Sequence, residues 1–129
     1  MPEIAPETVK IKFSFEYYDT VKHDYCISSW EEEKIKKALG RLKEVNAKSF
    51  NELRRDRRVY HFEEVDWSKT TEKGGFNNRG LANLSPFHFA LLGVNDQLAR
   101  VYGAYSAGTF YIVWFDLEHK IWPTPLKHT

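Results

Sequence analysis

The first hydrophobic pattern in the chain is a strict alternation near its beginning. In residues 9–16 every second side chain is apolar, at Val9, Ile11, Phe13 and Phe15. Successive side chains of a strand point to opposite faces, so this period of two predicts a half-buried β-strand. Residues 1–8 hold two prolines and two glutamates, and we expect them to form a flexible tail. The remaining residues, 9–129, are expected to form a single domain.

The second pattern recurs every three to four residues and follows a capping signal. Ser29 with Glu32 predicts a capping box at a helix start. The predicted buried stripe of that helix is Ile35, Ala38, Leu39, Leu42 and Val45. Gly40 lies inside it, and we expect another element to pack closely there. A second capping box, Ser49 with Glu52, predicts a shorter helix to about residue 55. Together these helices predict an αα-hairpin.

The later part of the chain reads mainly as strands. Residues 59–65 fit either a strand or a continued helix. Residues 69–86, rich in glycine and asparagine, predict a long loop. A strand is expected at 87–92, a turn at Asn95 and Asp96, and then a β-hairpin closed at residues 106–108. The whole pattern predicts an α+β fold, with the αα-hairpin packed on a mostly antiparallel sheet of four to five strands.

The C-terminal hairpin also predicts which side chains share a face. In its first strand Arg100, Tyr102 and Ala104 alternate with Val101, Gly103 and Tyr105. In its second strand Phe110, Ile112 and Trp114 alternate with Tyr111, Val113 and Phe115. Because both faces of the second strand are apolar, we expect it inside the sheet rather than at an edge.

Charge is unevenly distributed along the chain, although the net charge is only +1. Residues 34–58 contain ten lysines and arginines against three acidic residues, and the rest of the chain is acidic overall. Such segregation creates a local positive field. This distribution of charge is equally consistent with a solvated helix face and with a surface that binds phosphates or an acidic protein. The residues assigned here to nucleic-acid binding are Lys37, Arg41, Arg54, Arg55, Arg57 and Arg58.

The composition narrows the class of protein. Hydrophobic residues make up 42% of the chain, which indicates a folded core rather than disorder. The single cysteine, Cys26, excludes an internal disulfide and reads as a small buried hydrophobe. No run approaches the ~18 apolar residues of a membrane helix. We therefore expect a cytoplasmic protein without a membrane partner.

Two further groups of residues have chemical and structural interpretations. Tyr17, Tyr18 and Tyr25 could stack on bases or cover the edge of the core, and we favour the second. A zinc site from His61, His88 and His119 lacks the usual ligand spacing, so no metal site is assigned.

Polar residues at the two ends of the C-terminal hairpin form the candidate catalytic site. Pairing brings the entry of one strand beside the exit of the other, so Arg100 is expected near residues 116–120. Cleavage of RNA by its own 2′-hydroxyl needs a proton acceptor, a proton donor and positive charge on the phosphate. His119 titrates near neutral pH, Arg100 offers a planar fork for phosphate and Lys120 adds charge. Tyr102 and Asp116 are the other two candidate catalytic residues. The structural alternative is that Asp116 and His119 cap a turn while Arg100 forms an ion pair on the sheet.

The order of these elements resembles the RelE/ParE toxin superfamily, especially the RelE and YoeB ribonuclease toxins. Arg100, His119 and Trp122 stand where that family has an arginine near the start of the penultimate strand and a histidine and an aromatic residue at the chain's end. The resemblance implies a toxin of a toxin–antitoxin system that cuts mRNA as a metal-independent endoribonuclease without a cofactor. It also implies RNA, free or at the ribosome, and an acidic antitoxin-like protein as partners.

A second class of function is a non-catalytic module that binds nucleic acid or protein in a phage or plasmid accessory system. The segment at 110–120 resembles the ending of small uncharacterised proteins from mobile elements. A third class is an accessory protein that acts by protein contact alone.

Overall fold

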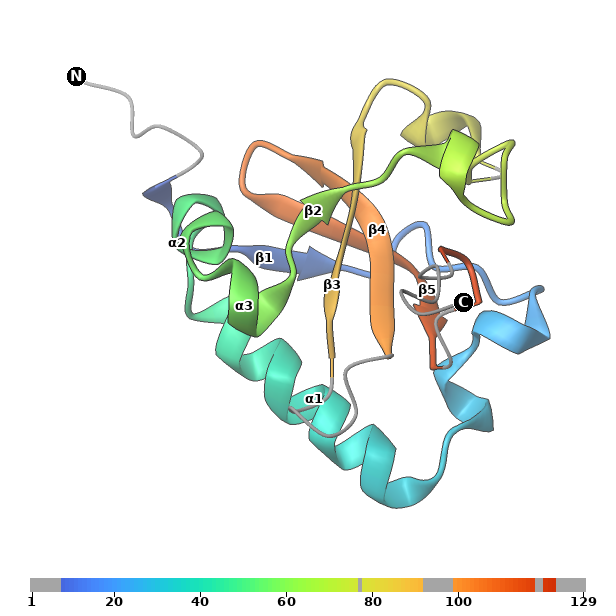
Figure 1. Cartoon of the computed structure of the whole chain (residues 1–129), viewed down its shortest axis with the longest axis horizontal. Helices are drawn as coiled ribbons and strands as arrows, with labels where there is room; N and C mark the ends of the chain where they lie inside the picture. Colours follow the sequence, from blue (N-terminus) through green and yellow to red (C-terminus); the bar gives the residue numbers. More distant parts are fainter. Residues whose placement is uncertain (1–7, 77, 92–98, 118–119, 123–129) are drawn as a thin grey trace, which may run out of the picture.

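One sheet with helices on one of its faces organises the molecule. The structure is a computed structural model, and it describes residues 8–76, 78–91, 99–117 and 120–122. Within these ranges the strands are β1 (Lys12–Ser14), β2 (Glu63–Glu64), β3 (Ser85–Ala90), β4 (Arg100–Ser106) and β5 (Thr109–Asp116). The helices are α1 (Glu32–Asn46), α2 (Phe50–Arg55) and α3 (Arg57–Tyr60), all between β1 and β2 (Figure 1). The predicted α+β class is confirmed.

The sheet is mixed, with the order β1-β5-β4-β3-β2. The pairings β2–β3, β3–β4 and β4–β5 are antiparallel, whereas β1 lies parallel to β5. A parallel pair needs a long crossover, and the chain between β1 and β5 supplies it. β5 therefore has a neighbour on each side, as its two apolar faces predict.

The helices cover one face of the sheet and share a core with it. Ala38, Leu42 and Val45 of α1 are buried in this core with Leu53 of α2. The predicted stripe is wrong at Leu39, which is 56% exposed because it points about 100° away from Ala38 around the helix. The expected close packing at Gly40 is also wrong, because the position where its side chain would begin faces open space.

The two predicted capping boxes have different outcomes. Ser49 accepts a hydrogen bond from the Glu52 backbone at 3.2 Å, and the Glu52 carboxylate accepts one from the Ser49 backbone at 3.1 Å, so this box is confirmed. The box at Ser29 is wrong: α1 has Glu31 as its N-cap, with no side-chain cap. The backbone at Ser29 instead ends a 3₁₀ turn, η3 (Ile27–Ser29), which follows η2 (His23–Tyr25).

Three helices replace the expected pair, and an αα-hairpin is not confirmed. Asp56, with φ −94° and ψ 53°, breaks the helical run and separates α2 from α3. The ambiguous segment at 59–65 holds the end of α3 and the two residues of β2. Only three residues of the predicted strand at 9–16 form β1, because the chain turns after Phe15, whose carbonyl accepts from the Tyr18 amide at 3.0 Å.

Loop segments cover the opposite face of the sheet. The segment expected to be one long loop contains the 3₁₀ turn η5 (Arg79–Leu81) and the end of η4 (Trp67–Lys69). Leu81 from this segment, Tyr25 and Ile121 are buried against Tyr102 and Trp114. Both faces of the central strands are therefore covered, which explains their continuous apolar sequences.

A β-bulge in the C-terminal hairpin changes which side chains share a face. Tyr102 pairs with Trp114 and Gly103 pairs with Ile112, so Val113 is the extra residue. Trp114 therefore packs on the face of Tyr102, and its predicted place beside Phe110 and Ile112 is wrong. For the same reason Phe115 belongs to the helix-covered core rather than to the face of Tyr111 and Val113.

The turn of this hairpin lies where it was predicted. Ala107 and Gly108 have φ values of 48° and 93°, as expected for a two-residue turn that follows the twist of the strands. The strand predicted at 87–92 begins earlier, at Ser85. The predicted turn at Asn95 and Asp96 and the tail up to residue 7 lie outside the described residues. None of the helices in the described part of the chain is long and apolar enough to cross a membrane.

Candidate functional site

Arg100 and Asp116 face each other across β4 and β5, as the sequence predicts. Both are buried, with exposed fractions of 8% and 1%. Arg100 Nη1 donates to the Ala99 carbonyl at 3.2 Å. Burial lowers the pKa of Arg100, and the field of neighbouring Tyr102 opposes that shift. The register thus places an arginine and a carboxylate in one protected corner at the end of the sheet.

The Asp116 carboxylate holds the chain that leaves β5. Oδ1 accepts from the Lys120 backbone at 3.0 Å, and Oδ2 accepts from the Ile121 backbone at 2.7 Å. Burial raises the pKa of Asp116, although these two hydrogen bonds favour its charged form. Asp116 therefore caps this turn, as the structural alternative expects.

Tyr102 lies in the same corner and is fully buried. Its ring stacks on His88 with centroids 5.0 Å apart and an interplanar angle of 19°. Within the described residues its hydroxyl has no hydrogen-bond partner. Burial raises the pKa of Tyr102 above its ordinary value, and the Asp116 charge adds to this effect. The side chain therefore stays neutral at physiological pH.

The two remaining candidates lie beyond the end of β5. Lys120 is exposed, and its carbonyl accepts from the Thr71 hydroxyl at 3.0 Å. The positive charge of Lys120 favours the ionised form of Asp116. His119 lies outside the described residues.

A row of polar side chains runs across the sheet toward this corner, and the sequence analysis did not predict that its members lie together. Glu63 of β2 pairs with His88 of β3, and His88 pairs with Tyr102 of β4. His61, just before β2, is half-buried and has a left-handed backbone with φ 49° and ψ 42°. A histidine at a predicted helix end would have indicated His61, but the sequence of residues 59–65 did not show where the helix ends.

His61 lies among charged groups from four elements. Burial lowers its pKa from the ordinary 6.5, and the positive charge of Arg100 lowers it further. Arg41 and Arg57 act in the same direction, whereas Glu63 opposes them. The imidazole is therefore neutral at neutral pH and has a lone pair that can accept a proton.

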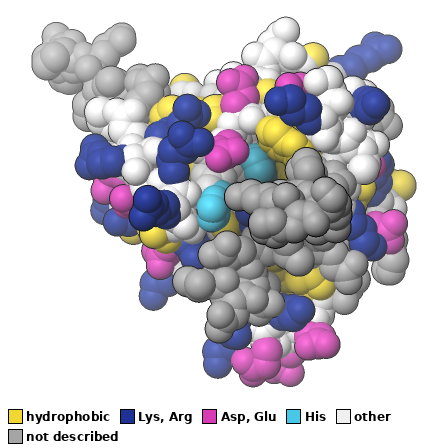
Figure 2. Space-filling model, viewed as in Figure 1, with side chains coloured by type: hydrophobic (Ala, Val, Ile, Leu, Met, Phe, Trp, Pro, Cys, Tyr) yellow, Lys and Arg dark blue, Asp and Glu magenta, His cyan; other side chains and the backbone are white. Residues whose placement is uncertain are grey.

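The predicted basic residues gather on the helices beside this row, and we call them the basic surface. Arg54, Arg55, Arg57 and Arg58 are all exposed on α2 and α3, and Lys37 is exposed on α1. Arg41 is half-buried and packs over the Tyr60 ring at 5.1 Å. Figure 2 shows basic side chains gathered over α2 and α3, with histidine side chains at the surface beside them.

Two side chains of the basic surface are held in place. Arg57 Nη2 lies 3.4 Å from Glu63 Oε1, which joins α3 to β2. The Arg54 guanidinium lies over the rings of Phe50 and Phe87, at 5.7 and 5.9 Å from their centroids. Anchoring of this kind reduces the entropy that an arginine loses when it binds a phosphate.

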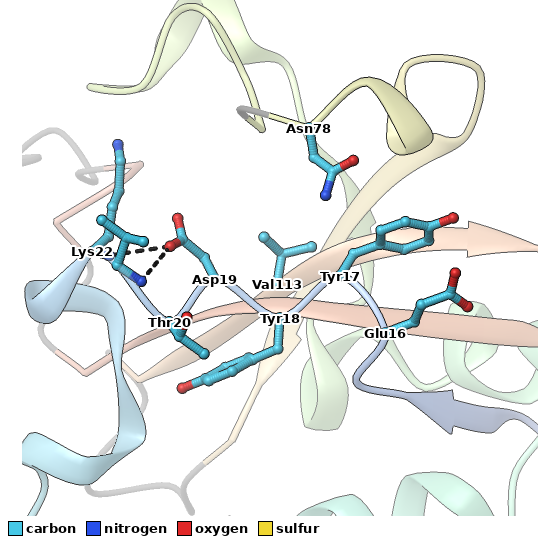
Figure 3. Close-up of a pocket in the computed structure, with 9 residues that line it drawn as sticks. Glu16, Tyr17, Tyr18, Asp19, Thr20, Lys22, Asn78 and Val113 are labelled. Atoms are coloured by element: carbon cyan, nitrogen blue, oxygen red, sulfur yellow. Dashed lines mark hydrogen bonds between the residues drawn. The ribbon is translucent and has the colours of Figure 1, made fainter.

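A separate cavity of about 350 Å³ lies beside the loop after β1. Its lining includes Glu16, Tyr17, Asp19 and Asn78 (Figure 3). Asp19 already accepts from the Val21 and Lys22 backbones at 2.9 and 3.1 Å and from Trp114 Nε1 at 2.8 Å. Asp19 therefore acts first as an anchor for this loop.

The other residues considered in the sequence have structural places. Tyr25 is buried and donates to Glu72 at 2.9 Å, and Tyr18 donates to Cys26 Sγ at 3.4 Å, as expected for side chains at the edge of the core. Hydrogen bonds from Ser28 and Tyr18 lower the pKa of Cys26. Among the described residues no group of three potential ligands is placed to hold a metal ion.

Comparison with known proteins yields no match to any family model, curated protein or solved structure.

Proposed function

We propose that this protein binds RNA through the basic surface and cuts it as a RelE-like, metal-independent endoribonuclease toxin. The observation that carries the proposal is the continuity between the basic surface and the corner at Arg100. Arg57 of the basic surface contacts Glu63, and Glu63 begins the row that continues through His88 to Tyr102, beside Arg100. A backbone phosphate held by the arginines would bring the neighbouring ribose to titratable groups.

The proposed likeness extends to the fold. α1 and α2, which are separated by only three residues, would correspond to the αα-hairpin of that family. The antiparallel strands β3, β4 and β5 would correspond to its sheet. Arg100 at the start of β4 would correspond to its arginine, and His119 to its histidine. In this proposal the protein works in the cytoplasm, and an acidic antitoxin-like protein covers the basic surface.

RNA binding is tested by the salt dependence of affinity. Each phosphate contact with single-stranded RNA contributes about −0.7 to the slope of log K against log salt. Reversing Arg54, Arg55 and Arg58 to glutamate should therefore remove roughly 2 units of slope. The matched control reverses Lys69, Lys73 and Arg79, which are exposed on the loop between β2 and β3 and change the net charge equally. Equal losses in the two triple variants, or an affinity indifferent to salt, would contradict the role of the basic surface.

Cleavage is tested by induced expression and by incubation of the purified protein with RNA. The wild type should arrest growth and cut RNA in the presence of a chelator, and His119→Ala should do neither. If neither protein cuts RNA or slows growth, the ribonuclease proposal is wrong. If both cut equally well, the ribonuclease proposal stands and the role of His119 is wrong.

A second candidate is a non-catalytic module that binds RNA or an acidic protein through the same surface. The observation that favours it is the burial of the corner: Tyr102 and Asp116 are at most 1% exposed, and Asp116 already accepts two backbone hydrogen bonds. Salt-dependent RNA binding without cleavage would support this candidate. Binding of an acidic protein without RNA binding would support its protein-binding form.

A further inference from the structure

His61 ends α3 in a backbone conformation that few residues with a β-carbon adopt. Its φ of 49° and ψ of 42° lie in the left-handed region, where α3 ends and the chain turns into β2. This conformation costs a residue with a β-carbon roughly 1–2 kcal/mol, and glycine or asparagine adopts it more readily. A histidine at such a position is a candidate functional residue, because strained backbone is concentrated at functional sites.

The surroundings of His61 are those of a phosphate-handling site. Its backbone amide donates to the Arg57 carbonyl at 2.9 Å, and the Arg57 side chain contacts Glu63 two residues further along the chain. The charged groups that act on the imidazole come from α1, α3, β2 and β4, and they are Arg41, Arg57, Glu63 and Arg100. Three of the four are positive, as a site that binds a phosphodiester requires. His61 is half-buried, so its ring is partly open to a ligand.

His88, the other described histidine side chain of this face, is placed less well for such chemistry. It is 5% exposed and lies between the rings of Tyr102 and Trp122, with centroid distances of 5.0 and 5.1 Å. A ring packed in this way supports the sheet surface and has little access to a ribose. His61 is therefore the better candidate for direct contact with RNA.

We propose that His61 is a catalytic residue that takes the proton from the attacking 2′-hydroxyl of the RNA. This inference rests on the proposed ribonuclease function. The 2′-oxygen forms a bond to phosphorus while its proton passes to the imidazole, and the bond between phosphorus and the 5′-oxygen breaks. The departing oxygen takes a proton from water, and the proton released later by His61 neutralises the hydroxide. The products are a 2′,3′-cyclic phosphate and a 5′-hydroxyl.

Arg57 and Arg41 are placed to hold the phosphate during this step. Arg57 is exposed and contacts Glu63, two residues after His61, and Arg41 of α1 packs over the ring of Tyr60, the residue before His61. Arg100 is buried and is a positioning residue, because its charge acts on His61 from below the surface. This arrangement keeps the imidazole neutral, and only the neutral form can act as the base.

The test uses His61→Asn and His61→Gly, because both residues tolerate the left-handed backbone and neither can take the proton. Loss of a general base should lower the cleavage rate at least about 100-fold. Affinity for RNA whose 2′-hydroxyls are methylated, and which cannot react, should stay within about twofold, since the arginines remain. His23→Asn, in η2, removes a histidine from another element and should cut like the wild type.

The pH profile and the products complete the test. The wild-type rate should rise with pH to a midpoint below 6.5, which coincides with the His61 titration followed by NMR. The RNA fragments should end in 2′,3′-cyclic phosphates. If the wild type cuts RNA and the folded His61 variants cut it equally well, this inference alone is wrong. It is also wrong if the midpoint of the rate differs from the midpoint of the His61 titration. A wild type that cuts no RNA overturns the proposed function and this inference together.

Discussion

Gly103 provides the most direct test of how β4 and β5 meet. A β-carbon at this position would lie 2.2 Å from the Tyr111 carbonyl oxygen and 2.5 Å from Cε1 of Phe110. The first distance is about 1 Å shorter than an ordinary carbon–oxygen contact of about 3.3 Å. The oxygen belongs to the backbone of a paired strand and cannot rotate away. Gly103→Ala must therefore push β4 and β5 apart beside the bulge.

The expected cost of Gly103→Ala is about 3 kcal/mol, at the upper end of the range for overpacked cores. A loss of this size should lower the midpoint of thermal unfolding by roughly 10 °C in a domain of this length. Urea unfolding, followed by tryptophan fluorescence, measures the free energy directly. Trp114 lies on a strand that must move, so its emission also reports on the local change.

Gly40→Ala is the matched control, because the same methyl group there meets nothing within 4 Å. Gly40 is exposed within α1, where alanine is favoured over glycine by up to about 1 kcal/mol. The two variants should therefore differ by about 4 kcal/mol, with opposite signs. A loss below about 1 kcal/mol for Gly103→Ala would refute the close approach of β4 and β5 at this position.

Three further substitutions test separate features by equilibrium unfolding. Ala107→Asn should stabilise the protein by about 1 kcal/mol, because Ala107 has a φ of 48° that asparagine tolerates better. Ser49→Ala should destabilise it by about 1 kcal/mol, because the side-chain cap of α2 is lost, and an unchanged stability would contradict the capping box. Asp116→Asn should cost about 1–3 kcal/mol, because an amide offers one acceptor oxygen to two backbone donors. The folded pKa of Asp116 is raised, so its contribution to stability is greatest below pH 3.8 and falls as the pH rises through the folded pKa. Asp116→Asn should remove this part of the pH dependence, and an unchanged curve would contradict the raised pKa.

The candidate site was only partly visible in the sequence. The turn at Ala107 and Gly108 predicts only that Arg100 lies near the end of β5, because the register it sets would pair Arg100 with Phe115. The bulge at Val113 shifts this register by one residue and places Asp116 opposite Arg100. The chemical character of the corner at Arg100 and Asp116 could not be predicted, because the burial of Asp116 depends on residues 120–121 folding back over it. The sequence analysis considered His61 only as a metal ligand, because the electrostatic influence of Arg100 on it joins the end of α3 to a strand about 40 positions later in the chain.

The sequence by itself determined the α+β class, the position of the C-terminal hairpin turn, the capping box at Ser49 and the interior position of β5. These features depend on local periodicity, turn chemistry and nearby hydrogen bonds, all of which act over a few residues. The tertiary structure alone decided the parallel pairing of β1 with β5, the exposure of Leu39 and the transfer of Trp114 to the face of Tyr102. The physical reason is that each depends on contacts between distant segments, and a single bulged residue reverses the side-chain alternation of everything beyond it.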